Sequence, residues 1–65
     1  MKKNYRITVI FKNEVIRAEL VSKTVAKSSI RQLKELYPNE FISGALEEKR
    51  QSWEVIWVLG NDKTS

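Results

Sequence analysis

The chain of 65 residues contains no cysteine and no histidine. The missing cysteine excludes disulfide bonds and thiolate metal sites, and the missing histidine removes the commonest general base and metal ligand. Only two glycines are present, Gly44 and Gly60, so no glycine-rich loop is available to hold phosphates. These absences argue against an enzyme that uses a metal ion or a nucleotide cofactor.

The groups left for catalysis are the carboxylates and the lysine, tyrosine and serine side chains. The carboxylates are scattered over predicted turns and strand surfaces. The one adjacent pair, Glu47 and Glu48, lies on a predicted strand, where neighbouring side chains point to opposite faces. We therefore expect no catalytic residues, no metal, no cofactor and no small-molecule substrate.

Long hydrophobic runs are also missing, and no segment approaches the roughly 20 apolar residues of a membrane span. A chain without cysteine fits a reducing compartment. We expect a soluble cytoplasmic protein with no membrane partner. Its length suits a single domain, residues 1–65, ordered from about residue 4 to residue 60 with a frayed polar tail at 61–65.

Apolar residues alternate with polar ones in four segments and repeat at helical spacing in a fifth. In chain order the predicted elements are strands Tyr5–Phe11 and Val15–Leu20, a helix over 25–37, and strands Phe41–Leu46 and Trp53–Leu59. Ser22 or Thr24 can cap the start of the helix, and Pro38 ends it. The predicted fold class is α+β in the order ββαββ, a four-stranded antiparallel sheet with one helix packed on one face.

A two-residue turn at Lys12-Asn13 sets the predicted register of the first hairpin. In this register Ile10 faces Val15, and apolar side chains meet apolar ones on both faces. A slip of one residue would place apolar against polar side chains throughout. Asn13 tolerates the positive φ of a type I′ turn, so we expect that turn type.

The second hairpin admits two loop lengths. A two-residue turn at Arg50-Gln51 would place Glu47 opposite Glu54, a like-charge pair, whereas a four-residue loop over 50–53 places Lys49 opposite Glu54. The pattern favours the longer loop. With either loop the side chains predicted to lie under the helix are Ile42, Gly44, Leu46, Val55, Trp57 and Leu59.

More apolar side chains remain than one helix can cover. The surplus falls on the face of the sheet turned away from the helix and consists of Ile10, Val15, Ala45, Ile56 and Val58. These residues form one strip if the first and last strands are neighbours, with a polar rim of Arg6, Arg17, Glu19, Glu47 and Glu54. The candidate partner-binding residues are Ile10, Val15, Ile56, Val58, Arg6 and Arg17. The β-propensity of branched side chains would also place them on an exposed strand face without a partner.

Two aromatic side chains fall outside the predicted helix-facing set. Phe41 has the parity of the open face, and Trp53 lies in or beside the second loop. A partly exposed tryptophan can anchor an interface, although in a small domain it more often closes the end of the core.

Charge is distributed unevenly along the chain, whose net charge is +4. Residues 1–34 hold nine basic and two acidic side chains, and residues 35–65 hold three basic and six acidic ones. On the helix, a basic stripe falls opposite the predicted sheet-facing arc and consists of Lys23, Lys27, Arg31 and Lys34. Such a stripe can follow a nucleic-acid backbone through phosphate contacts, or it can simply be the solvated face of the helix.

The predicted helix leads through Tyr37-Pro38-Asn39-Glu40 into a strand that starts with Phe41-Ile42. In this motif and in its order of elements, over about residues 5–59, the chain resembles small accessory proteins of phages and mobile elements. The step Phe41-Ile42 with the following Gly44-Ala45-Leu46-Glu47-Glu48 is similar to part of the small epsilon subunit of Gram-positive RNA polymerase. Both resemblances imply a non-enzymatic protein that binds a larger machine.

Two functions are therefore expected. The first is a protein-binding module, an accessory protein or inhibitor of a larger nucleic-acid-handling or host protein, acting alone or as a homodimer through the sheet. The alternative is sequence-nonspecific nucleic-acid binding through the basic stripe of the helix.

Overall fold

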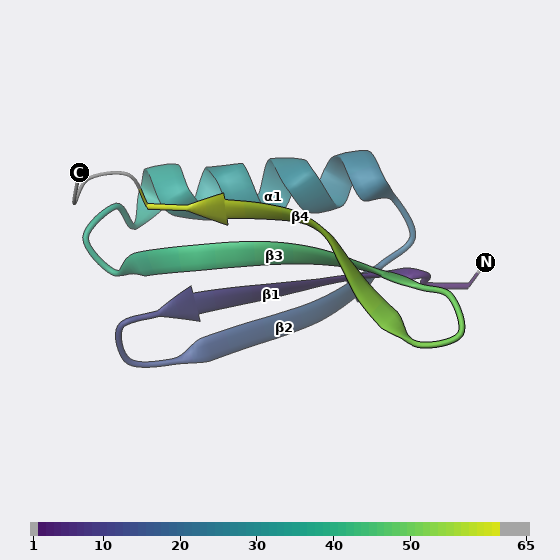
Figure 1. Cartoon of the computed structure of the whole chain (residues 1–65). Helices are drawn as coiled ribbons and strands as arrows, with labels where there is room; N and C mark the ends of the chain where they lie inside the picture. The colour runs from purple at the N-terminus through teal and green to yellow at the C-terminus, as the bar shows by residue number, and fades with distance from the viewer. Residues whose placement is uncertain (1, 62–65) are drawn as a thin grey trace.

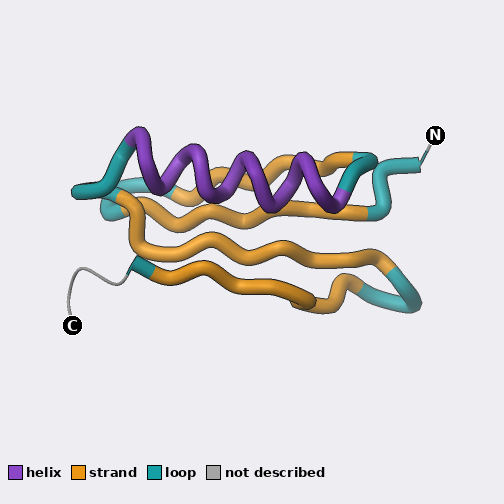
Figure 2. Tube along the Cα trace, turned by 90° about the horizontal axis from the view of Figure 1, so that it is seen from above, coloured by secondary structure: helices purple, strands orange, loops and turns teal. Residues whose placement is uncertain are grey.

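The structure, a computed structural model, describes residues 2–61. Its elements are β1 (Tyr5–Phe11), β2 (Val15–Leu20), α1 (Lys23–Leu36), β3 (Phe41–Lys49) and β4 (Trp53–Gly60). The strands form one antiparallel sheet in the order β2-β1-β3-β4, and α1 lies along one face of it (Figure 1, Figure 2). The predicted α+β fold class and the order ββαββ are confirmed. We call the sheet face turned away from α1 the open face.

The helix begins at a side-chain cap and ends at the residue before proline. Ser22 Oγ accepts a hydrogen bond from the Val25 N–H at 3.3 Å, which satisfies one of the amides that have no partner inside the helix. At the other end the Tyr37 N–H donates to the Leu33 carbonyl, and Pro38 then prevents a further turn. Of the two predicted caps, Ser22 and Thr24, the structure has Ser22. The regular helix starts two residues before the predicted range 25–37 and stops one residue before its end.

The register of the first hairpin is the predicted one, with Ile10 opposite Val15 and Tyr5 opposite Leu20. The Phe11 N–H donates to the Glu14 carbonyl at 2.8 Å across the two-residue turn. The predicted turn type is wrong, because no non-glycine residue among those described has a positive φ and a type I′ turn needs two such values.

Two β-bulges interrupt the pairing of β3 and β4 with their neighbours. Ile10 pairs with Ser43 but Phe11 pairs with Phe41, so Ile42 is an extra residue on β3. Likewise Leu46 pairs with Trp57 but Glu47 pairs with Val55, so Ile56 is an extra residue on β4. An extra residue reverses the parity of the strand beyond it, so the alternation changes face at each bulge.

Both bulges overturn predicted side-chain positions. Phe41, which has open-face parity in the sequence, is 2% exposed in the core, while Ile42 is 48% exposed. Val55, predicted under the helix, is 58% exposed, while Ile56, predicted on the open face, packs against the core. The bulge in β3 places the larger Phe41 in the core instead of Ile42, and the bulge in β4 packs Ile56 against the core instead of Val55.

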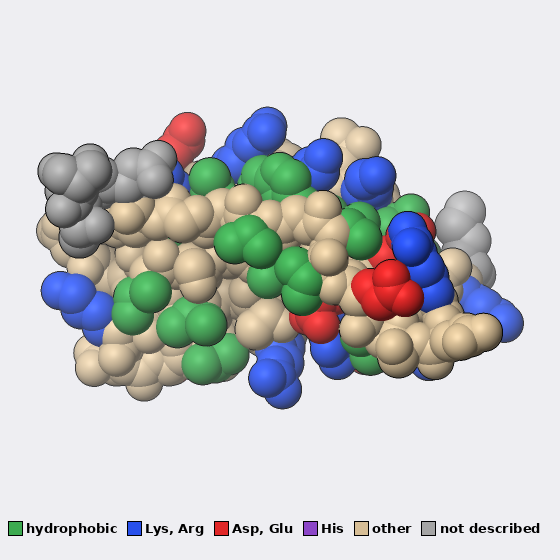
Figure 3. Space-filling view, viewed as in Figure 1, with side chains coloured by type: hydrophobic (Ala, Val, Ile, Leu, Met, Phe, Trp, Pro, Cys, Tyr) green, Lys and Arg blue, Asp and Glu red, His purple; other side chains and the backbone are tan. Residues whose placement is uncertain are grey.

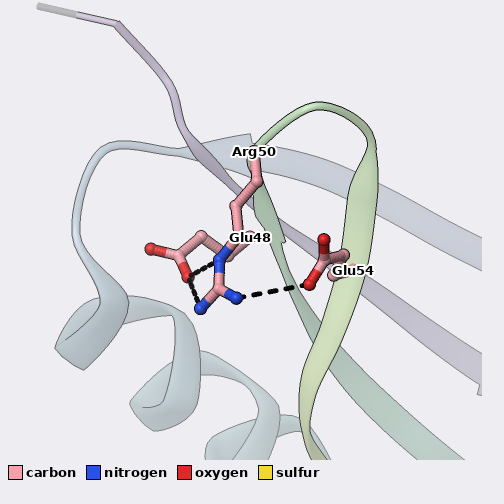
Figure 4. Close-up of polar contacts among 3 residues, drawn as sticks. All are labelled: Glu48, Arg50 and Glu54. Carbon is pink, nitrogen blue, oxygen red and sulfur yellow. Dashed lines mark hydrogen bonds and ion pairs between the residues drawn. The ribbon is translucent and has the colours of Figure 1, made fainter.

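The loop of the second hairpin spans three residues, 50–52, and brings two acidic residues directly opposite each other. Gly44 lies opposite Leu59, as the favoured register predicts, but beyond the bulge Glu48 faces Glu54 and Lys49 faces Trp53. Arg50 lies between the two carboxylates and bonds to Glu48 at 2.9 Å and to Glu54 at 3.3 Å (Figure 4). The predicted avoidance of a like-charge pair is therefore wrong, because one guanidinium bridges both carboxylates and offsets their repulsion.

The core lies between α1 and the two central strands. Its buried side chains come from β1, α1 and β3 and are Ile7, Val9, Phe11, Ala26, Ile30, Phe41 and Leu46. Phe11 makes edge-to-face contacts with Tyr37 and Phe41, with ring centroids 6.0 and 6.2 Å apart, and these rings close one end of the core.

Asn61 fastens the end of the described chain to the bulged start of β3. Its side-chain amide donates to the carbonyls of Pro38 and Phe41, and its N–H donates to the Ile42 carbonyl. The predicted fraying is therefore wrong at this residue. The rest of the predicted tail, 62–65, lies outside the described residues.

Gly44 sets how closely α1 approaches the sheet. A Cβ atom at this position would overlap Ile30 Cγ2, a methyl group of a branched side chain in the middle of the helix. A Cβ atom at Gly60, by contrast, would meet no atom within 4 Å. The helix therefore rests on the backbone of β3 at Gly44.

We expect Gly44→Ala to lower the free energy of unfolding by about 1–3 kcal/mol, because the added methyl group overpacks the contact with Ile30. Gly60→Ala is the matched control and should change it by less than about 0.5 kcal/mol. Urea denaturation of the two variants measures both values. Equal stability losses would contradict the close packing of α1 at Gly44.

Candidate functional site

The apolar side chains of the open face form a diagonal strip across all four strands. Val15 of β2 lies opposite Ile10 of β1, and Ala45 of β3 lies opposite Val58 of β4. Ala45 pairs with Thr8, two residues before Ile10, so the two apolar pairs are diagonal neighbours. The predicted condition for one strip, that the first and last strands are neighbours, is not met. β3 lies between β1 and β4 and supplies Ala45, which connects the two apolar pairs.

Most of this strip is accessible to solvent. The exposed fractions are 38% for Ile10, 55% for Val15 and 61% for Val58. Val55 extends the strip along β4 and is 58% exposed. In Figure 3, hydrophobic side chains gather over the β1–β2 hairpin and over the middle of β3 and β4. We call Ile10, Val15, Ala45, Val55 and Val58 the apolar strip.

A hydrogen-bonded ion pair borders the apolar strip. The Arg6 guanidinium donates to both carboxylate oxygens of Glu47, at 3.1 and 2.7 Å, and the Thr8 hydroxyl donates to the same carboxylate at 2.9 Å. The hydrogen bonds from Arg6 hold the pKa of Glu47 below its ordinary value of 4.5, and partial burial opposes this shift only in part. Glu47 is therefore ionised at neutral pH, and both of its carboxylate oxygens accept hydrogen bonds.

Trp53 covers the other side of the Arg6 guanidinium. The guanidinium carbon lies 4.5 Å from the centre of the Trp53 ring, a cation–π contact. Because β4 changes parity at its bulge, Trp53 and Val55 both fall on the open face. Sequence reasoning considered Trp53, in or beside the second loop, as an interface anchor or as the end of the core, and it placed Val55 under the helix. Neither residue was in the predicted site. The only signal for Val55 was the run Val55–Leu59, whose unbroken apolar character cannot be divided between two faces by alternation.

The predicted partner-binding residues are brought together with one exception. Ile10, Val15, Val58, Arg6 and Arg17 lie on the open face, with Arg17 exposed and opposite Thr8. Ile56 does not belong with them, since it packs against the core at the bulge. The corrected apolar set replaces Ile56 by Val55.

The basic stripe of α1 lies on the flank of the helix next to β4, and not on the side opposite the sheet. Lys27 Nζ lies 5.7 Å and the guanidinium carbon of Arg31 5.6 Å from the centre of the Trp57 ring on β4. The prediction was wrong because the buried arc is narrower than the apolar arc, and Val25 and Leu36 are 52% and 61% exposed. Lys23 and Lys34 share this flank by helical spacing. Across residues 2–61, none of the stripe's four side chains takes part in an ion pair.

No group of three or more acidic side chains within residues 2–61 could hold a metal ion. A hollow of about 350 Å³ lies beside Ile16, Leu33 and Tyr37, with Glu14 and Glu40 also in its lining. Both of these carboxylates are exposed to solvent. Among the same residues, no helix is long and apolar enough to cross a bilayer.

No protein-family model, curated protein or solved structure matches this chain. The two surfaces of the chain that bear on its function are the apolar strip and the basic stripe.

The low pKa of Glu47 predicts how stability depends on pH. A carboxylate with a lowered pKa in the folded state adds stability above its ordinary value of 4.5, and this stability is lost as the pH falls through the lowered pKa. We expect wild type to lose stability below pH 4.5 and Glu47→Gln to lose less over the same range. Thermal unfolding as a function of pH measures the difference.

Glu54→Gln is the control for this measurement, because Glu54 is exposed and its contact with Arg50 is 3.3 Å long. This variant should keep the acid-induced loss of wild type. Parallel pH profiles for wild type and Glu47→Gln would show that the contact between Arg6 and Glu47 does not stabilise the fold.

Proposed function

We propose that the chain is a non-enzymatic protein-binding module that uses the open face of its sheet. The observation that supports this proposal is the apolar strip, in which Val15, Val55 and Val58 are each more than half exposed. Antiparallel sheets with one solvated face normally place polar side chains there. An exposed apolar surface with a polar border is typical of an interface.

The border of the strip is suited to burial against a partner. Arg6, Glu47 and Thr8 satisfy one another by hydrogen bonds, so a partner need not supply a counter-charge for them. An ion pair that is already formed and hydrogen-bonded loses less on desolvation than two separate charges. Trp53 beside Arg6 adds an aromatic side chain of the kind enriched at interface centres. We propose that the partner is a larger protein and that this chain acts as its accessory protein or inhibitor.

We expect Val58→Lys to reduce partner binding by about tenfold or more without unfolding the domain, because a lysine ammonium cannot be desolvated in the strip without an acid opposite it. Affinity capture from host extract, with nuclease present, measures the loss. The Val58 side chain is 61% exposed, so the domain itself should tolerate the change.

Ser28→Lys is the control for the added charge, since Ser28 is exposed on the outer side of α1, away from the open face. A protein that is captured by wild type and Ser28→Lys and lost with Val58→Lys is bound through the open face. Equal capture by all three proteins, or capture that nuclease abolishes, would refute the proposal.

Nucleic-acid binding through the basic stripe is the second candidate function. It is supported by four cations on one flank of α1 that have no acidic partner within the described chain. Phosphate contacts alone would give binding without sequence preference. Two of these cations, Lys27 and Arg31, lie over the ring of Trp57, which is only partly buried.

If four phosphates are contacted, affinity for duplex DNA should fall by about a hundredfold between 50 and 200 mM salt. Lys23→Glu combined with Lys34→Glu should abolish binding, because both changes fall on the basic stripe. Lys3→Glu combined with Lys12→Glu alters the net charge equally at exposed positions off the helix and should retain most of the affinity. Fluorescence anisotropy measures all three proteins, and an equal loss in both double variants would refute a specific role of the stripe.

A further inference from the structure

β2 is an edge strand that is exposed on both of its faces. All residues from Val15 to Glu19 are exposed, including Ile16 and Ala18 on the helix side. Its register with β1 runs without a bulge, so its outer edge is regular. A regular edge with apolar side chains can pair with another strand.

The outward backbone groups of β2 follow from the hairpin. The Phe11 N–H bonds to the Glu14 carbonyl, so this pair is hydrogen-bonded, and hydrogen-bonded pairs alternate along an antiparallel ladder. Ile16, Ala18 and Leu20 therefore direct their backbone groups toward β1. Val15, Arg17 and Glu19 direct theirs toward the free edge.

We propose that β2 pairs antiparallel with β2 of a second copy of this chain, with Ala18 on the two-fold axis. In this register each Arg17 lies opposite Glu19 of the other copy, and both are residues whose backbone groups point outward. Ile16 lies opposite Leu20 of the other copy on the helix side. The strand is therefore complementary to itself in charge and in hydrophobicity.

The neighbouring symmetric registers lack this complementarity. A shift that centres the axis on Arg17 places two arginines opposite each other, and a shift that centres it on Glu19 places two glutamates opposite each other. Registers centred farther along the strand leave fewer residues paired. The register centred on Ala18 thus combines opposite charges, apolar contacts and the outward hydrogen-bonding groups.

The surroundings of the two sheet edges also favour β2 as the strand that pairs with a second copy. The other edge strand, β4, is interrupted by its bulge, and Figure 1 shows it twisting strongly across the sheet, which hinders pairing. Val25 and Leu36 lie about a quarter turn round α1 from the buried side, on the flank away from β4. Their exposed side chains therefore lie on the flank of α1 nearer β2, the edge that a second copy would extend.

Charge reversal with rescue tests the register. Arg17→Glu and Glu19→Arg should each raise the dimer dissociation constant by about tenfold or more, because each turns two attractive pairs into two repulsive ones. The double variant that carries both changes restores opposite charges across the axis and should dimerise like wild type. Sedimentation equilibrium measures the three constants. Thermal unfolding of dilute samples checks each fold, since Glu19 also faces Arg6 within the sheet.

A cysteine on the axis gives an independent measurement, because the native chain has no cysteine. Ala18 would face its symmetry mate in a pair without backbone hydrogen bonds, at a Cα separation of about 4.5 Å that a disulfide can span. Ala18→Cys should form a covalent dimer rapidly under mild oxidation. Ser28→Cys, exposed on the outer side of α1, should not.

A wild-type protein that stays monomeric at millimolar concentration would overturn the proposal. So would a dimer that is unchanged by Arg17→Glu, or an Ala18→Cys variant that oxidises no faster than Ser28→Cys. The pairing leaves the apolar strip uncovered, so these outcomes do not bear on the proposed protein-binding function. Val58→Lys should leave the dimer constant unchanged.

Discussion

One helix covers a four-stranded sheet, and the width of that helix limits what the fold can bury. An α-helix with its side chains is about 10–12 Å across, while the axes of four strands spaced about 4.8 Å apart span roughly 14 Å before their side chains are added. α1 packs over the two central strands and rests on the backbone of β3 at Gly44. Both edge strands therefore keep exposed surface even on the helix side, and the whole open face is left without cover.

The two β-bulges decide which side chains occupy these uncovered surfaces. Each bulge reverses the alternation of one strand, so that Phe41 enters the core while Val55 and Trp53 move to the open face. The bulge in β4 also disrupts that edge of the sheet. The same local irregularity thus extends the apolar strip and leaves β2 as the regular edge.

The two proposed surfaces are compatible in one assembly. Pairing of β2 with β2 of a second copy would use backbone groups and leave the open faces of both copies on one continuous sheet. The polar border of the strip is fixed within each copy by the contact of Arg6 with Glu47, whose carboxylate also accepts from Thr8. A dimer would then present two apolar strips to a partner, which increases apparent affinity when the partner offers two sites.

The alternation of apolar residues was sufficient to predict the element order, the fold class and the register of the first hairpin, because these depend on local periodicity and on short-range pairing. The same periodicity placed Ile10, Val15, Val58, Arg6 and Arg17 on the open face, where the structure has them. The basic side chains of α1 were also recognised as one stripe.

Tertiary structure alone decided the strand order and the flank of α1 on which the basic stripe lies. It also decided that Val55, and not Ile56, belongs to the apolar strip. Strand order depends on contacts between residues far apart in the chain, and here it places β3 between β1 and β4. A bulge is selected by how well large side chains such as Phe41 fill the core, and this packing cannot be read from alternation when adjacent residues are equally apolar. Sequence periodicity determined which residues share a strand, and packing determined which face each of them occupies.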